Sequence, residues 1–209
     1  MQYADIVSVL GDVQGNNSRE WYVQQKEIFK EIHILLHDLY FAVGSRLREK
    51  VHIDNNPRKS ISRPYNDQRF GHKPYLRDNM WITFQTKECP MPAFFIEFSS
   101  CGIRIGMGYY SATPAQMRDL RGKIDHRPQR VSGMLEKVLQ DKELQAIGEP
   151  YKKRFPSSHE GLLGEIYNFR SIYFQKIVPA NDWENIEQIA GDTFLELVPM
   201  YQWFVEEGL

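Results

Sequence analysis

The stretch from residue 80 to residue 109, MWITFQTKECPMPAFFIEFSSCGIRIGMGY, decides the fold. It contains three runs rich in aromatic and β-branched residues, at 80–84, 93–98 and 103–109, which predict three strands. In the third run, apolar residues alternate with arginine and glycine, as expected of a strand with one buried face. The two connectors are too short to hold a crossover helix, so neighbouring strands should pair as an antiparallel meander.

Helices are predicted upstream of these strands. Apolar residues recur at three- and four-residue steps from Trp21 to Leu47, which predicts one long helix that begins after the N-cap residue Ser18. A shorter helix is predicted over residues 3–13, and the polar segment 52–64 should form a loop.

Helices are also predicted downstream. Thr113-Pro114-Ala115-Gln116 is a capping box with proline at the first helical position, so a helix should start there. Two more should start near Pro128 and near Asn181, the last one carrying an apolar stripe as far as Phe204. With no internal repeat and no linker-like composition, we predict a single α+β domain over residues 1–209. It should be an antiparallel sheet packed with several helices, including long N-terminal and C-terminal ones.

Composition and charge limit the classes of function. The chain has 209 residues, of which 42% are hydrophobic, and a formal net charge of -1. General nucleic-acid binders are usually basic, so nucleic-acid binding is not expected. No run approaches the ~20 apolar residues of a membrane span, and the N-terminus does not resemble a signal peptide. We therefore expect a cytoplasmic protein without membrane contact, in which Cys89 and Cys101 are reduced; a disulfide between them is the alternative.

The densest polar cluster is RPYNDQRFGHKPY, from Arg63 to Tyr75. Along an extended chain, the side chains of Arg63, Tyr65, Asp67 and Arg69 would lie on one side. An aspartate between two guanidinium groups should form a bidentate pair and stay ionised, which leaves donors on the other arginine and on Lys73 for an anionic ligand. The alternative is a salt-bridge network that pins this segment to the sheet.

Other motifs are less informative. His33 and His37 have the i, i+4 spacing of metal ligands but no obvious third ligand, so we expect neither a metal nor a cofactor. Gly106-Met107-Gly108 lacks the third glycine of a dinucleotide-binding loop; the better interpretation is a glycine pair over which a bulky side chain packs. The carboxylates of Asp67, Glu97 and Glu165 would serve acid–base catalysis only if folding brought two of them together.

Several segments resemble one known family. GNNSREWY, from Gly15, looks like its N-N-x-R-E-W-F helix start, and the 63–75 cluster is similar to its R-x-x-x-D-x-R-F…K-x-P-Y-K core signature. Residues 106–121 resemble the family's glycine-rich strand and the helix that follows it. Residues 148–154 resemble its G-x-x-L-K-R stretch, and residues 197–200 resemble its L-x-P-L ending. Together these segments resemble the bacterial and fungal domain of unknown function 2461 family, in order and over most of the chain.

The match also has departures. The segment 70–75 is slightly shorter than in the family pattern, Leu76 stands where lysine is common, and residues 157–160 replace the usual K-G-Y and D-H-P pieces. The resemblance implies the fold and the one-domain extent, and it implies no reaction. A basic site in this chain would be a modified form of the family's site.

The leading hypothesis is a binding protein or an enzyme for a small anionic ligand that carries phosphate or carboxylate. Arg63, Arg69 and Lys73 would hold the anion, Asp67 would orient the guanidinium groups, Tyr75 and Arg104 would line the floor, and Lys153 and Arg154 would add contacts if folding brought them near. Otherwise Lys152-Lys153-Arg154 would be a solvated loop.

The alternative is a non-catalytic protein–protein interaction module, in which Trp21, Tyr109, Tyr110 and Trp203 would form an exposed partner surface. RNA binding by the basic segment 46–77, with tyrosines that stack on bases, is a weaker third hypothesis. Nothing in the sequence indicates the oligomeric state.

Overall fold

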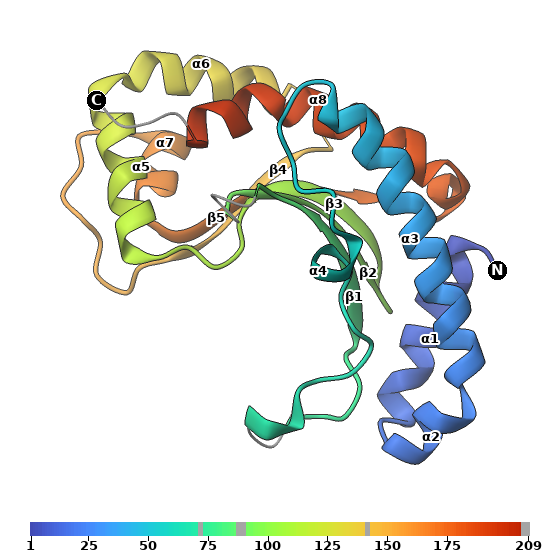
Figure 1. Cartoon of the computed structure of the whole chain (residues 1–209). Helices are drawn as coiled ribbons and strands as arrows, with labels where there is room; N and C mark the ends of the chain where they lie inside the picture. The colour runs from blue at the N-terminus through green and yellow to red at the C-terminus, as the bar shows by residue number, and fades with distance from the viewer. Residues whose placement is uncertain (71–72, 87–90, 141–142, 206–209) are drawn as a thin grey trace.

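The computed structural model describes residues 1–70, 73–86, 91–140 and 143–205 (Figure 1). The helices are α1 (Tyr3–Gly15), α2 (Arg19–Gln24), α3 (Lys26–Arg48), α4 (Pro57–Ser60), α5 (Pro114–His126), α6 (Pro128–Val138), α7 (Gly161–Tyr167) and α8 (Ile186–Val205), with short 3-10 turns at Gln68–Phe70 and Ala180–Asn185. The strands are β1 (Asn79–Phe84), β2 (Ala93–Ser99), β3 (Gly102–Tyr109), β4 (Gln145–Pro150) and β5 (Phe169–Val178). This is the α+β architecture that the sequence predicts.

The strands form one antiparallel sheet in the order β1-β2-β3-β5-β4. β1, β2 and β3 are the predicted meander, and Ile82, Ile96 and Ile105 are aligned across it. β4 and β5 were not predicted. β5 reads FRSIYFQKIV and has the residue types of a strand, whereas β4 reads QAIGEP and lacks them.

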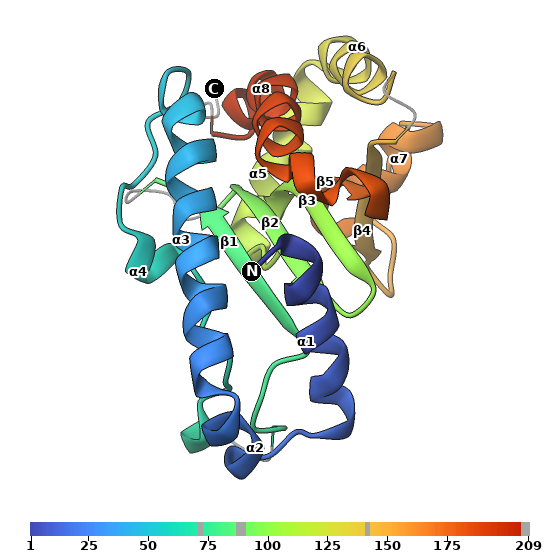
Figure 2. The ribbon, with the colours of Figure 1, turned by 90° about the vertical axis from the view of Figure 1, so that its right-hand side faces the viewer.

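A large part of the core lies between one face of the sheet and the three helices α1, α3 and α8, and buried residues of α5, α6 and α7 extend it. In Figure 1 the sheet is curved and α1, α3 and α8 follow its convex side; Figure 2, turned by 90°, shows these helices in front of the strands. Alternate residues of the strands are buried against them, as the period of two requires. Phe84 of β1 and Phe94 of β2, for example, both contact the ring of Phe194 on α8, at 5.4 and 5.1 Å between centroids.

The helix signals are mostly confirmed. Ser18 caps α2 by accepting a hydrogen bond from the amide of Trp21, and Thr113 and Gln116 form the predicted capping box of α5. Two details differ from the prediction. The helix that was expected to be continuous from Trp21 breaks at Gln25, between α2 and α3, and α8 is preceded by a 3-10 turn in which Asn181 is not the cap.

The other face of the sheet is concave and carries the alternate, partly exposed residues of the strands. Trp81 and Thr83 of β1, Phe95 and Glu97 of β2, and Arg104 of β3 all lie on it. In the described part of the chain, none of the helices has both the length and the apolar character that crossing a membrane requires.

Candidate functional site

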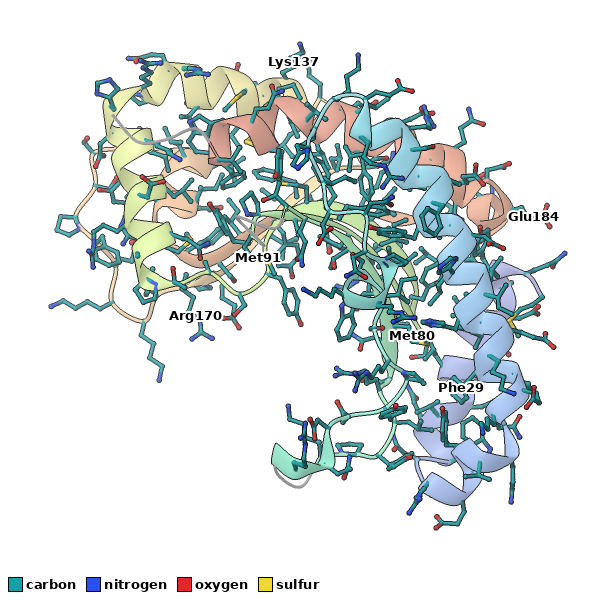
Figure 3. All side chains as sticks on the ribbon, in the orientation of Figure 1. Phe29, Met80, Met91, Lys137, Arg170 and Glu184 are labelled. Atoms are coloured by element: carbon teal, nitrogen blue, oxygen red, sulfur yellow. The ribbon has the colours of Figure 1, made fainter. Side chains whose placement is uncertain are left out.

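A pocket of about 230 Å³ lies on the concave face of the sheet. Four strands and two flanking residues line it: Asn79, Trp81, Thr83, Ala93, Phe95, Glu97, Arg104, Gly108, Tyr173 and Gln175, with Met91 (labelled in Figure 3) and Tyr110 beside them. Its lining is mainly apolar and aromatic with a few polar groups, which is the usual composition of a small-molecule site.

One glycine of β3, Gly108, lines this pocket, and a second, Gly106, lies two residues before it on the same strand. A Cβ atom at position 106 would lie 2.1 Å from the carbonyl oxygen of Phe174, so a side chain cannot be accommodated there without movement. Because β3 has glycine at 106 and 108, the rings of Phe95 and Tyr173 on the flanking strands meet edge to face across it, with centroids 6.1 Å apart. The glycine pair therefore serves side-chain packing, as predicted.

Arg104 and Glu97 form a cross-strand ion pair inside the pocket. The Nη2 of Arg104 donates to Glu97 Oε1 at 2.6 Å, and Asn79 Nδ2 donates to the same oxygen at 3.1 Å. The Glu97 side chain is 12% exposed and that of Arg104 is 36% exposed. Burial lowers the pKa of Arg104, but the hydrogen bond and charge of Glu97 outweigh it and the pKa is raised. The guanidinium therefore stays charged.

The Arg104 guanidinium retains free donors. Among the described residues, the guanidinium makes one hydrogen bond, from Nη2 to Glu97. Its other N–H groups are therefore available to a ligand. The pocket also contains an unused acceptor, because the Gln175 carboxamide oxygen is buried and has no hydrogen-bond partner among the described residues. Native proteins pair nearly all such buried polar atoms, so this oxygen is available as a hydrogen-bond acceptor at the pocket.

A second guanidinium stands beside the pocket. Arg77 stacks over the ring of Trp81, 4.8 Å from its centroid, and its buried Nε has no hydrogen-bond partner among residues that the structure describes. Two tyrosines lie at the opposite side of the pocket. Burial raises the pKa of Tyr173, and Tyr110 lies at the rim and is 71% exposed. Among the residues that the structure describes, the pocket and its wall thus combine two arginines with one carboxylate, that of Glu97.

The predicted cluster at 63–75 lies apart from this pocket, on a hairpin. Tyr65 pairs with Leu76, the amide of Asn66 donates to Tyr75 O at 2.9 Å, and Gln68–Phe70 forms a turn between the two arms. The expectation of an extended chain with Arg63, Tyr65, Asp67 and Arg69 on one side is wrong, because this turn interrupts the alternation.

Asp67 and Arg69 do form the predicted bidentate pair. Arg69 Nε donates to Asp67 Oδ1 at 2.9 Å and Nη2 donates to Oδ2 at 2.6 Å. The side-chain and backbone hydrogen bonds from Arg69 lower the pKa of Asp67 to about 2, and the charge of Arg63 adds to this effect. The Arg69 side chain is 80% exposed, so the pair is at the surface.

Neutral groups hold the hairpin to the rest of the protein. The side chain of Asn17 accepts from the amide of Leu76 at 2.6 Å and donates to its carbonyl at 3.1 Å. Tyr75 packs against Tyr65 and against Tyr22 of α2, with centroids 6.2 and 6.0 Å apart. The alternative interpretation was that salt bridges pin this segment to the rest of the protein. The contacts described here, which attach the hairpin to the segment before α2 and to α2 itself, involve uncharged groups.

The remaining predicted residues lie in three places. Arg104 is the one predicted site residue that lines the pocket. Lys153 and Arg154 are exposed on the loop between β4 and α7, which Figure 1 shows far from the hairpin. Lys73 is exposed on the hairpin. Trp81, Phe95, Tyr173 and Gln175, which the sequence analysis did not select, could be found only from the strand register.

Two further expectations can be compared with the structure. The prediction that Trp21, Tyr109, Tyr110 and Trp203 form one exposed partner surface is wrong. Tyr109 and Trp203 are buried in the core, and Trp21 is partly buried. Cys101 is free and exposed, while Cys89 lies outside the described residues.

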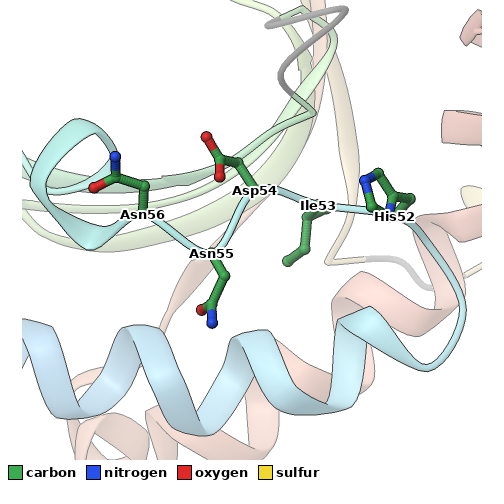
Figure 4. Close-up of a pocket in the computed structure, with 5 residues that line it drawn as sticks. All are labelled: His52, Ile53, Asp54, Asn55 and Asn56. Atoms are coloured by element: carbon green, nitrogen blue, oxygen red, sulfur yellow. The ribbon is translucent and has the colours of Figure 1, made fainter.

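A second hollow, of about 480 Å³, follows α3. Among the described residues its lining is His52, Ile53, Asp54, Asn55 and Asn56, consecutive positions of one loop (Figure 4). The backbone of Asp54 has a structural role there, since its carbonyl accepts from Tyr40 and its amide donates to Gln85. No second described element contributes converging groups, so the pocket of the sheet is the stronger candidate.

Comparison with known proteins gives one match. Residues 5–203 match the model of the family described as "Conserved hypothetical protein (DUF2461)". No curated protein and no solved structure matches the chain.

Proposed function

We propose that this chain, which belongs to the conserved hypothetical protein family DUF2461, binds a small anionic ligand with a flat, apolar body on the concave face of its sheet. The observation that carries the proposal is the free donor capacity of Arg104 within an aromatic pocket. A guanidinium fork matches the geometry of carboxylate and phosphate groups.

Charge and hydrogen bonding favour an anion with a donor group. Among the described residues that line the pocket or stack on its wall, Arg104 and Arg77 carry two positive charges against the one negative charge of Glu97, so an anionic ligand would balance this group. The unpaired oxygen of Gln175 would accept from a ligand hydroxyl or amine. The rings of Phe95, Tyr173 and Trp81 would cover the faces of an aromatic or other flat body.

The ligand should be small. A volume of about 230 Å³ is below the roughly 300–1,000 Å³ of pockets for drug-sized molecules. Contacts from Arg63, Asp67, Arg69, Lys73, Tyr75, Lys153 and Arg154 to this ligand stay a prediction, and the proposal does not depend on them.

The test is a titration of the full chain with 4-hydroxybenzoate and with its neutral amide, followed by NMR. We expect saturable shift changes at Arg104 and at the amides around Phe95 and Tyr173, and weaker binding of the amide. Replacing Arg104 and Glu97 together by glutamine should raise the Kd about tenfold or more, because a charge-assisted hydrogen bond is lost. The double change leaves no buried carboxylate unpaired.

The chain provides a matched control. Arg170 and Glu149 form another ion pair on the same sheet, outside the pocket and exposed, so the same double change to glutamine there should leave the Kd unaltered. Equal affinity in both double variants, or no saturable shifts on the concave face, would reject the proposal.

A further inference from the structure

Arg121 of α5 is a buried cation that has no counter-ion among the residues placed by the structure. It is 9% exposed, and its Nη1 is fully buried with no hydrogen-bond partner in the part of the chain that the structure describes. Its guanidinium forms no ion pair or hydrogen bond with any residue of the described ranges, and neither the hairpin nor the pocket of the sheet includes it. Buried charged groups in native proteins are normally paired, so this one requires an explanation.

Two aromatic rings from the β4–α7 loop cover this guanidinium. The ring of Phe155 lies 4.0 Å from Arg121 Cζ and that of Tyr151 lies 5.6 Å away, and the two rings contact each other edge to face. The loop is attached at both residues, because Asn168 accepts from the amides of Tyr151 and Phe155 through its carbonyl and its side-chain oxygen.

Aromatic faces attract a cation but do not accept its in-plane N–H groups as an oxyanion does. The carboxylate one helical turn away, Asp125, is already engaged, since His159 Nε2 lies 2.9 Å from one of its oxygens and Tyr167 donates to the other at 3.0 Å. The donors of Arg121 are therefore available to an anion that is not part of the chain.

The loop that covers Arg121 is itself basic. Lys152, Lys153 and Arg154 are exposed and lie between the two aromatic residues that contact the guanidinium. Phosphate binds well where a bidentate arginine is surrounded by further positive charge.

We propose that Arg121 and the segment Lys152–Arg154 form an anion site, separate from the sheet pocket, that takes a phosphate group beneath the ring of Phe155. The ring is 40% exposed and acts as a cover, so that binding requires it to move aside. The phosphate can be inorganic or the end group of a monoester, and both present the same oxygens to the guanidinium.

The test is a titration of the full chain with inorganic phosphate and with methyl phosphate, against chloride at equal ionic strength, with the Arg121 Nε–H signal followed by NMR. We expect a phosphate-specific shift. Arg121→Gln should raise the Kd about tenfold or more. Phe155→Ala should lower it several-fold, because the site then no longer has to open. Tighter binding of methyl phosphate would identify a monoester as the ligand, and tighter binding of inorganic phosphate the free ion.

Arg118→Gln is the matched control, since it removes an exposed arginine from the same helix. It should leave the Kd unchanged. Should Arg121→Gln fail to fold, Arg121→Lys retains the charge, loses the planar fork and should still weaken binding. The proposal is overturned if phosphate shifts the Arg121 signal no more than chloride does. It is also overturned if Arg121→Gln and Arg118→Gln give the same Kd, or if Phe155→Ala does not lower the Kd.

Discussion

Asp67 is the residue whose ionisation the structure changes most clearly. The hydrogen bonds from Arg69 lower the pKa of its carboxyl group to about 2, from an ordinary value of 3.8. Because the folded-state pKa lies below the unfolded-state value, the pair stabilises the folded chain above that ordinary value, and the contribution is lost as the pH falls toward 2.

We predict that an NMR titration of the Asp67 carboxyl carbon will have its midpoint near pH 2 in the wild-type protein. Arg69→Gln should move the midpoint up toward 3.8, because the two side-chain hydrogen bonds are lost. A wild-type midpoint already near 3.8 would show that the pair does not form in solution.

Gly106 is a residue at which the backbone of the neighbouring strand leaves no room for a side chain. Gly106→Ala would place a methyl group 2.1 Å from the Phe174 carbonyl oxygen, so β3 and β5 would have to separate locally. We predict a loss of about 1–3 kcal/mol in the free energy of unfolding, measured by chemical denaturation.

Gly122→Ala on α5 is the control for this change. A Cβ atom at position 122 meets nothing within 4 Å, and alanine is the better helix former, so this variant should gain about 0.5–1 kcal/mol. If the two alanine variants had similar stabilities, the close approach of β3 and β5 would be in doubt.

At the scale of elements, the side chain of Asn17, which precedes α2, supplies two of the contacts that hold the 63–77 hairpin. The Asn17 side chain takes the place of a strand partner for Leu76. It donates a hydrogen bond to the Leu76 carbonyl and accepts one from the Leu76 amide. Asn17→Ala should cost roughly 1–3 kcal/mol in local stability, since two partly buried hydrogen bonds are lost. The measurement is amide hydrogen exchange at Asn66 and Arg77, which should become faster.

Asn16→Ala is the comparison for this prediction, because the Asn16 side chain is exposed and donates to Asp12 within its own helix. Exchange in the hairpin should be unaffected by that change. Equal acceleration in both variants would mean that the hairpin is held by something other than Asn17.

At the scale of the whole molecule, the sequence predicted the parts of the fold whose signals are local. Aromatic and β-branched residues identified β1, β2 and β3, with alternation as a further signal in β3, and capping residues located the starts of α2 and α5. β5 has a strand-like composition that could have been recognised, and the same alternation that placed Ile103 in the core also predicts a buried Tyr109. β4 could not be found in this way, since QAIGEP acquires its structure by pairing with β5.

The candidate site was less predictable because no short segment contains it. Arg104 was selected from the sequence, but its neighbours Glu97, Trp81 and Tyr173 come from three other strands and meet it through the register of the sheet. The charges of residues 63–75 were conspicuous in the sequence because they are consecutive. They lie on a hairpin whose described residues do not contribute to the lining of the pocket.

The strand order also determines when the sheet can be completed. β3 and β5 are neighbours, yet the whole stretch from residue 110 to residue 168 separates them, and β4 is translated before the strand with which it pairs. On the ribosome, one edge of β3 therefore stays open until β5 has emerged. Long-range pairing is slow because loop-closure entropy must be overcome first, and unpaired edges promote aggregation. Until β5 pairs with it, this edge of β3 is exposed to pairing with strands of other chains.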